Sequence, residues 1–327
     1  MLTMREPGLL LSFVAFFAAC ASPDAALAQK WPEKPVRLII AFAPGGVHDT
    51  LARLLQPKLN ESLGQPILLE NRGGAGGNVA AEAVVRSAND GYTFLIASEA
   101  IATNEALYGK LNYDPQRDLA LVAIMARFPL ALVVNAELAA NSTTELIALA
   151  RAKPGALSFA SAGIGASGHL AGEMFKSITG IDAVHVPYKG GAPAMNDLVA
   201  GRIQFMFLSV SLSAPQVQQG KLRALAVVNS SRNALMPTVP TIAEAGVASF
   251  DALLFSGMHA PTGTPAAIIN RMSEELGRAV RAPDMQKRLA EIGAVPMPST
   301  PAEFTATLSR ERERWGKLIR ERGIRAE

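Results

Sequence analysis

Residues 36–64 read VRLIIAFAPGGVHDTLARLLQPKLNESLG, an apolar run followed by two adjacent glycines and a stretch of helical composition. Short apolar runs rich in branched residues are typical of buried strands, and a glycine directly after a helical stretch is a common helix stop. We therefore expect a strand over Val36–Ala43, a loop over 44–49 and a helix over Thr50–Leu63 that ends at Gly64. A strand, a loop and a helix in this order form the repeating unit of α/β proteins.

The same alternation continues along most of the chain. Further buried strands are predicted at Ile67–Leu69, Phe94–Ala97, Leu130–Val134, Val184–Val186 and Leu222–Val228. A second helix is predicted over His169–Thr179, because Gly180 follows it. The pattern predicts an α/β fold with mainly parallel sheets and helices on both faces.

The C-terminal quarter reads as nearly all helix. Thr264-Pro265 supplies an N-cap and a proline at the first helical position, for a helix that runs to about Arg281. Thr300-Pro301-Ala302-Glu303 fits a capping box, which predicts the start of another helix. In that helix four large apolar residues recur at helical spacing and are expected to pack against a sheet: Phe304, Leu308, Trp315 and Ile319.

The N-terminus carries an export signal. Residues 9–21 read LLLSFVAFFAACA, an apolar run shorter than the roughly 20 residues that span a bilayer. Ala26-Leu27-Ala28 then fits the small-x-small pattern that signal peptidase cleaves. We predict a signal peptide over residues 1–28 and a soluble periplasmic protein that starts at Gln29. The alternative is a lipoprotein anchored through Cys20, because the FAAC sequence that ends there resembles a lipobox.

Composition limits the function. Cys20 is the only cysteine among 327 residues, so a chain cleaved after Ala28 has no disulfide and no catalytic thiol. The net charge is +3, and no run of Lys and Arg is interleaved with aromatics, which argues against a nucleic-acid partner. No G-x-S-x-G or Walker lysine motif occurs, and the histidines lack metal-ligand spacing: His48, His169, His185 and His259. We therefore expect no catalytic residue, no metal and no cofactor.

The first glycine loop, Ala43–Asp49, lies between a predicted strand and its helix. Adjacent glycines let the backbone approach a ligand, and the helix that follows directs free N–H groups and the positive end of its dipole at it. Asp49 is well placed to cap that helix. The alternative is a plain tight turn with a capping aspartate.

The second glycine loop reads SAGIGASG over residues 161–168. Its glycines fit G-x-G-x-x-G, so a dinucleotide site has to be considered. The Rossmann fingerprint also needs an acidic residue at the end of the next strand, where this chain has Pro187-Tyr188-Lys189. Asp182 lies before that strand, at the wrong end. His169 and His185 are expected to be structural.

From Trp31 to Ile324 the chain resembles the Bug-type solute-binding receptors of tripartite tricarboxylate transporters. The matching motifs, in order, are WPEKPVRLII, APGGVHDTLAR, ENRGGAGGN, NDGYTFL, LYGKLNYDPQRDL, SAGIGASGHLAGEMF, HVPYKGGAPAMNDLVAGRI, GKLRALAV, VPTIAEAG and APTGTP. The resemblance implies a two-domain type II periplasmic binding protein clamshell. The first domain would comprise residues 29–128 and a mostly helical return segment over 254–327, with the second over 129–253. It further implies a monomeric receptor that holds a small carboxylate and has membrane transporter subunits as partners.

The resemblance also implies where the ligand lies. Its acid group would be held by backbone amides and waters from the two glycine loops, without a dedicated arginine. The ligand-binding residues expected on this basis are Gly45, Gly46, Asp49, Asn104, Gly165, Ala166 and Ser167. We add His48, because it lies in the first glycine loop.

Four residues at three places depart from the family pattern. Val47-His48 stands where small or hydroxyl residues are usual, Ala166 where Ser or Thr is common, and Leu208 where an Asp often follows Met206-Phe207. They make the pocket less hydroxylic and more imidazole-like. We expect His48 to donate a hydrogen bond to an anionic ligand, with affinity rising as the pH falls through about 6.5. Two other functions stay open: a periplasmic ligand-sensing subunit of a signalling system, and a nucleotide-using enzyme.

Overall fold

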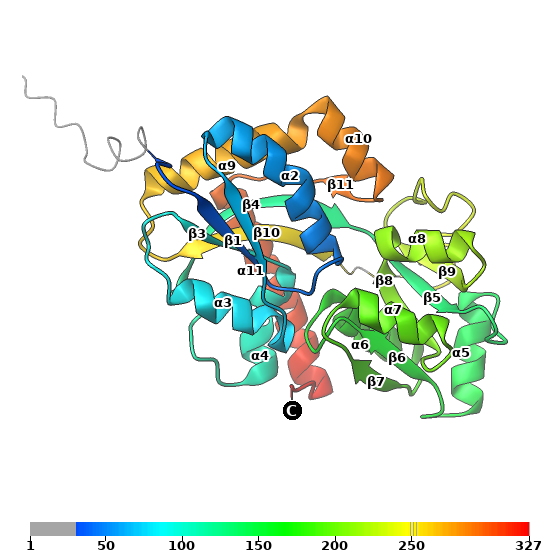
Figure 1. Ribbon diagram of the computed structural model, residues 1–327. Helices are drawn as coiled ribbons and strands as arrows, with labels where there is room; N and C mark the ends of the chain where they lie inside the picture. The colour runs from blue at the N-terminus through cyan, green and yellow to red at the C-terminus, as the bar shows by residue number, and fades with distance from the viewer. Residues whose placement is uncertain (1–30, 249, 251, 253, 327) are drawn as a thin grey trace, which may run out of the picture.

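The computed structural model describes residues 31–326, except 249, 251 and 253, and forms two lobes, each built on one sheet (Figure 1). The strands of the first sheet are β1 (Val36–Ile40), β2 (Ile67–Asn71), β3 (Thr93–Ala97), β4 (Leu119–Phe128), β10 (Leu254–Pro261) and β11 (Val295–Pro296), in the order β11-β4-β10-β3-β1-β2. Those of the second are β5 (Leu130–Asn135), β6 (Ser158–Ser161), β7 (Val184–Pro187), β8 (Phe205–Ser209) and β9 (Leu222–Val228), in the order β7-β6-β8-β5-β9. The predicted signal peptide lies outside the described residues.

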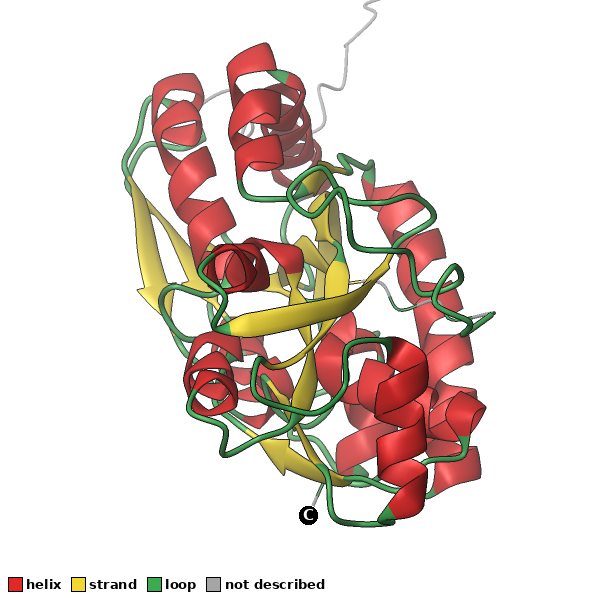
Figure 2. Cartoon of the chain, turned by 90° about the vertical axis from the view of Figure 1, so that its right-hand side faces the viewer, coloured by secondary structure: helices red, strands yellow, loops and turns green. Residues whose placement is uncertain are grey.

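Helices lie on both sides of the strands (Figure 2). The first lobe carries α2 (Val47–Leu63), η1 (Ala75–Gly77), α3 (Asn78–Val85), η2 (Glu99–Ala102), α4 (Asn104–Tyr108), α9 (Ala266–Arg281), α10 (Pro283–Glu291) and α11 (Pro301–Arg322). The second carries α5 (Thr143–Ala152), α6 (Ser167–Thr179), α7 (Gly191–Val199) and α8 (Val210–Gln218). Within the described part of the chain, no helix has the length and apolar character needed to cross a membrane.

The α/β fold predicted from the sequence is confirmed, but both sheets are mixed rather than mainly parallel. β1 pairs in parallel with β2 and β3, and β6 with β7 and β8. β10 and β5, in contrast, pair antiparallel with both of their neighbours. A parallel neighbour needs a crossover, usually a helix. β4 continues into β5 with only Pro129 between them, so the chain enters the second sheet without such a crossover.

The chain passes from one sheet to the other twice. It first changes sheet between Phe128 and Leu130, and it returns between Val228 and Leu254. These changes of sheet support the domain limits at 128 and 253, which we retain as a proposal.

The last helix, α11, contacts the cores of both lobes. Its predicted capping box is confirmed: the Glu303 N–H donates to Thr300 Oγ1 at 3.2 Å, and the Thr300 N–H donates to Glu303 Oε2 at 2.8 Å. Phe304 packs edge-on against Phe255 of β10 in the first lobe. Trp315, three turns further on, belongs to the buried cluster that contains Phe175 and Phe250 of the second lobe. The predicted apolar stripe therefore spans the junction of the two lobes.

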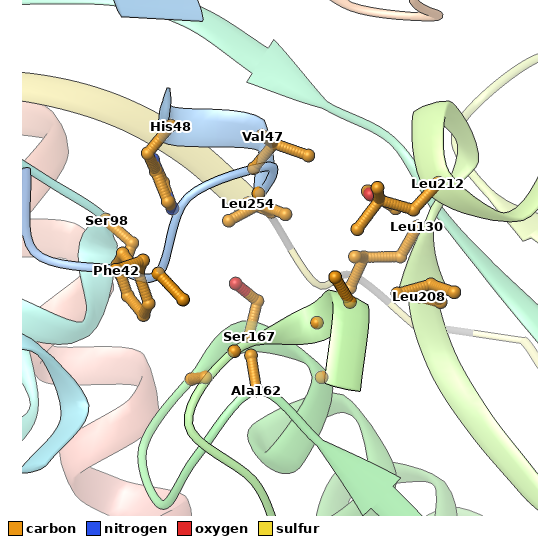
Figure 3. A pocket seen from close by; sticks show the side chains of 18 of the residues that line it. Phe42, Val47, His48, Ser98, Leu130, Ala162, Ser167, Leu208, Leu212 and Leu254 are labelled. Atoms are coloured by element: carbon orange, nitrogen blue, oxygen red, sulfur yellow. The ribbon is translucent and has the colours of Figure 1, made fainter. Parts of the chain in front are cut away.

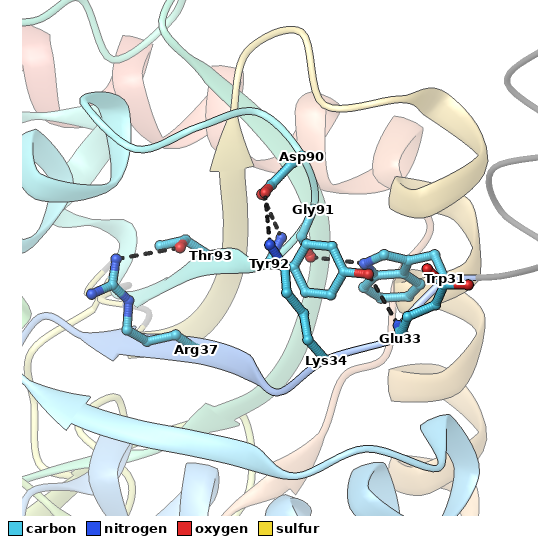
Figure 4. Close-up of polar contacts among 8 residues, drawn as sticks. All are labelled: Trp31, Glu33, Lys34, Arg37, Asp90, Gly91, Tyr92 and Thr93. Atoms are coloured by element: carbon cyan, nitrogen blue, oxygen red, sulfur yellow. Dashed lines mark hydrogen bonds and ion pairs between the residues drawn. The ribbon is translucent and has the colours of Figure 1, made fainter.

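The first described residues are fixed to the segment before β3 (Figure 4). Trp31 Nε1 donates to the Gly91 carbonyl at 3.1 Å, and the Glu33 N–H donates to the Tyr92 hydroxyl at 3.0 Å. The Lys34 ammonium lies 4.2 Å from the centre of the Tyr92 ring. Two of the motifs quoted for the family resemblance, WPEKPVRLII and NDGYTFL, thus contact each other directly.

Candidate functional site: a cavity between the lobes

A cavity lies between the two lobes and is lined by both. The space between its walls, including the part open to solvent, is about 620 Å³, which limits a ligand to a small molecule. The first lobe contributes Phe42, Ala43, Pro44, Gly46, Val47, His48, Ser98 and Leu254. The second contributes Leu130 of β5, the loop before α6, the start of α7, and the junction of β8 with α8.

Four helices begin at this cavity. The residues that precede their first turns, Gly46 of α2, Ala166 of α6, Gly190 of α7 and Ser209 of α8, all line it. None of these four residues caps its helix through a side-chain hydrogen bond. First-turn N–H groups have no partner within a helix, and the positive end of the helix dipole lies there. The cavity is therefore suited to a negatively charged group although no cationic side chain lines it among the described residues.

The first glycine loop places two of its four predicted residues in the cavity wall. Gly46 and His48 line the cavity, whereas Gly45 and Asp49 do not. Because α2 begins at Val47, three residues before its predicted start, His48 and Asp49 belong to its first turn.

Asp49 does not cap its helix, which corrects the expected role. Its Oδ2 accepts hydrogen bonds from the Gly45 N–H and from Arg53 Nε, both at 3.0 Å. Burial alone would raise the pKa of Asp49. Hydrogen bonds from Arg53, the Gly45 N–H and Asn71 outweigh it and hold the pKa below its usual range. The carboxylate therefore holds the glycine loop in place from a position outside the cavity wall.

His48 is a neutral part of the wall. Its ring stacks on Phe42 with centroids 4.6 Å apart, and Nδ1 shares a hydrogen bond of 2.5 Å with Ser256 Oγ. Burial lowers the pKa of His48 to about 3. Burial therefore argues against the expectation that its charge would strengthen binding as the pH falls through about 6.5, because it keeps the imidazole of the ligand-free protein neutral in that range.

In the second glycine loop, Ala166 and Ser167 line the cavity and Gly165 does not. The Gly165 N–H donates to His169 Nδ1 at 3.0 Å, so this histidine shapes the loop from inside the lobe. Asn104 also lies outside the cavity. It is fully buried, and its Nδ2 donates to the Gly76 carbonyl at 3.1 Å and to Asn78 Oδ1 at 2.8 Å.

Packing explains the last glycine of the G-x-G-x-x-G motif, Gly168. A methyl group on Gly168 would lie 2.5 Å from the Phe207 carbonyl oxygen, so α6 can approach β8 only without a side chain there. His169 stacks on His185 with ring centroids 3.9 Å apart, and Ser161 Oγ bonds His185 Nε2 at 2.7 Å. These contacts confirm structural roles for both histidines and leave the nucleotide hypothesis without a carboxylate at the end of β7.

Sequence reasoning missed Glu99, which lies behind Ser167. Its carboxyl group accepts a short hydrogen bond from Ser167 Oγ of the second lobe and one of 3.2 Å from the Phe255 N–H. The side chain is fully buried, and burial raises the pKa of Glu99 to about 7 although both hydrogen bonds act against it. An isolated glutamate after a strand carries no sequence signal for such a position.

Polar and apolar side chains occupy different sides of the cavity (Figure 3). His48 and Ser98 lie on one side beside Phe42, with Ser167 below them, whereas Leu130, Leu208 and Leu212 gather on the opposite side. Leu208, one of the departures from the family pattern, is thus part of the apolar wall.

Two α/β lobes that the chain links twice, with a cavity between them, form the architecture of a solute-binding protein. Solved structures agree. An R. palustris protein with adipate has a TM-score of 0.86 at 36% identity, covering 90% of this chain and 98% of that one. The periplasmic binding protein BugD reaches 0.85 at 30% identity, covering 91% and 100%. MatC from Rhodopseudomonas palustris, with bound malate, reaches 0.83 at 31%, covering 88% and 100%.

Residues 51–324 match the family described as tripartite tricarboxylate transporter family receptor. A Pseudomonas sp. (strain P51) protein from the tcbD-tcbE intergenic region is 36% identical over 318 residues, 97% of this chain and 95% of that protein. Protein BugT of Bordetella pertussis is 35% identical over 319 residues, 97% and 98% of the two chains. The chain belongs to this family of receptors, whose fold is that of solute-binding proteins rather than enzymes.

Proposed function

We propose that this protein is a periplasmic receptor that captures a small carboxylate between its two lobes and delivers it to a tripartite tricarboxylate-type membrane transporter. Gly46 and His48 of the first lobe and Ala166 and Ser167 of the second are the proposed ligand-binding residues. No catalytic step is part of this function.

The observation that carries the proposal is the start of four helices at one cavity. An anion there receives N–H groups from α2 of the first lobe and from α6 and α7 of the second, whereas the first N–H of α8, that of Val210, donates to the Pro129 carbonyl at 2.8 Å. Negative groups at helix N-termini are stabilised by these donors and by the dipole. Relatives solved with adipate and with malate support a carboxylate as the anion.

A thermal-shift screen tests the charge requirement. The purified protein is heated with mono-, di- and aromatic carboxylates and, in parallel, with the primary amide of each acid. The amide has almost the same shape but no charge. At a hundred times its dissociation constant, a ligand of the folded state adds about 2.7 kcal/mol of stability, which is a shift of several degrees.

We expect at least one carboxylate to raise the melting temperature and its amide to leave it unchanged. Absence of any shift across the acids would contradict the proposal, as would an equal shift by acid and amide. The delivery step rests on the family, and uptake of the bound solute should be lost in cells that lack this gene.

A further inference from the structure

The cavity differs between its two sides in a way that bears on the ligand beyond its acid group. Of the described residues that line it, none is Lys, Arg, Asp or Glu. The one ionisable side chain in the wall, His48, is neutral because its ring is buried against Phe42. The helix N-termini are therefore the only features of this wall that favour a negative charge.

The polar side chains that line the cavity are few. His48, Ser98 and Ser167 lie on one side (Figure 3), and Ser98 Oγ already accepts the Ala100 N–H at 3.2 Å. A fourth, Ser209, accepts a hydrogen bond of 3.1 Å from Ser211. The wall opposite His48 is formed by leucine side chains from three elements: Leu130 of β5, Leu208 of β8 and Leu212 of α8.

A second carboxylate placed against these leucines would lose its water without gaining a cation, and the first N–H of α8 beside them, that of Val210, already donates to the Pro129 carbonyl at 2.8 Å. Burying an unpaired ionised group is strongly unfavourable, whereas an alkyl or aryl group at the same place gains from leaving water. A ligand that matches both sides has one acid group and an apolar body.

Resting on the proposed function, we infer that the ligand of this receptor is a monocarboxylate with an apolar alkyl or aryl body, which lies against Leu130, Leu208 and Leu212. The acid group lies on the side of His48 and Ser167. This preference separates the protein from its relatives with adipate and malate, which hold dicarboxylates.

Matched pairs of acids test the inference by calorimetric titration at pH 7.5. Hexanoate and adipate have the same chain length, and adipate replaces the terminal methyl by a second carboxylate. Benzoate and terephthalate form an aromatic pair. We expect hexanoate and benzoate to bind at least tenfold more tightly than their diacid partners.

Two leucine-to-lysine variants sharpen the test. Leu212→Lys places an ammonium group at the apolar side, from a half-buried helix position that a long side chain tolerates. This variant should bind hexanoate more weakly and adipate more tightly, so that the ratio of the two dissociation constants changes at least tenfold. Leu68→Lys, at a leucine of β2 that is 52% exposed and outside the cavity, should behave as the unchanged protein.

Adipate binding as tightly as hexanoate to the unchanged protein would overturn this inference and leave the proposed function intact. No binding by any acid would overturn both. Circular dichroism checks the folding of each variant, and the unchanged protein decides the question alone if Leu212→Lys does not fold.

Discussion

The Glu99 carboxyl group joins the two lobes directly behind the cavity. Ser167 of α6 donates its hydroxyl proton to it, and Ser167 is also a wall residue. A serine hydroxyl has a single proton to donate. When Glu99 is ionised, Ser167 can give that proton either to Glu99 or to a ligand carboxylate, but not to both. When Glu99 is protonated, it donates to the serine oxygen, and the serine proton is free for the ligand.

Glu99→Gln should change how stability depends on pH. Burial raises the pKa of Glu99 to about 7, above the value of 4.5 for an exposed glutamate. A raised acid pKa means that the contribution of the group to stability is complete below about pH 4.5 and is lost as the pH rises through 7. The loss is of order 3 kcal/mol. We expect the free energy of unfolding, measured in urea, to be higher for the variant than for the unchanged protein at pH 8 but not at pH 4.5.

The histidines act in the opposite direction, and they are the same in both proteins. Burial lowers their pKa values, so they favour the folded state above about pH 6.5 and destabilise it as the pH falls toward the folded values: about 3 for His48 and His185, about 4 for His169 and His259. Their effect cancels in the difference between the two proteins. Glu313→Gln, at an exposed glutamate of α11, is the control, and a pH-independent difference for Glu99→Gln would contradict the assignment.

The two features that sequence reasoning missed, the position of Glu99 and the neutral state of His48, depend on distant partners. The contacts of Glu99 come from residues 68 and 156 positions away, and His48 contacts Ser256, 208 positions away. The glycine loops, in contrast, were recognisable because they follow strands and precede helices. Proximity to the cavity was therefore predictable for Gly46 and Ser167, but the neutral state of His48 was not.

At the scale of single elements, two helical glycines have opposite surroundings. A methyl group on Gly172 of α6 would lie 2.2 Å from the Phe159 ring, which is held by stacking against His185 and Phe205. A methyl group on Gly316 of α11 would meet only the end of the exposed Arg320 side chain, at 3.3 Å.

The same substitution should therefore change stability in opposite directions. Gly172→Ala forces a buried ring out of place and should destabilise the protein by about 1–3 kcal/mol. Gly316→Ala removes the entropic cost of a helical glycine and should stabilise it by about 0.5–1 kcal/mol. Denaturant unfolding of the two variants side by side measures both, and shifts of the same sign would show that the packing around one of them is misjudged.

Element positions were predictable where local pattern and burial agree. The strand over Leu222–Val228 has the predicted bounds, and the others listed from the sequence differ by one to three residues. β1 stops at Ile40 rather than Ala43, because the chain leaves the sheet to form the cavity wall at Phe42. β4, β8 and β10 were not among the predicted strands, and in β10 the sequence LFSGMHAP has weak strand propensity. Its pairing with both β3 and β4 overrides that propensity.

For the whole molecule, closure of the lobes is the expected response to ligand. Contacts already join the lobes beside the cavity, including the hydrogen bond of 3.4 Å from the Tyr108 hydroxyl to the Ile164 carbonyl. A ligand that contacts both walls favours the arrangement in which all its contacts form together. Small-angle scattering should therefore give a smaller radius of gyration at saturation with an acid found in the screen. An unchanged radius would indicate a receptor that is closed before it binds.

The position of Trp315 gives this receptor a built-in optical signal. The chain has two tryptophans, and Trp31 packs on Tyr92 and Phe94 within the first lobe. Trp315 instead lies in the cluster shared with the second lobe, with the Arg314 guanidinium 4.6 Å from its ring centre. The emission wavelength and intensity of indole fluorescence depend on nearby charge and water. Rotation of the second lobe would therefore change the emission of one tryptophan and leave the other as an internal reference, so solute capture could be followed in real time without an attached dye.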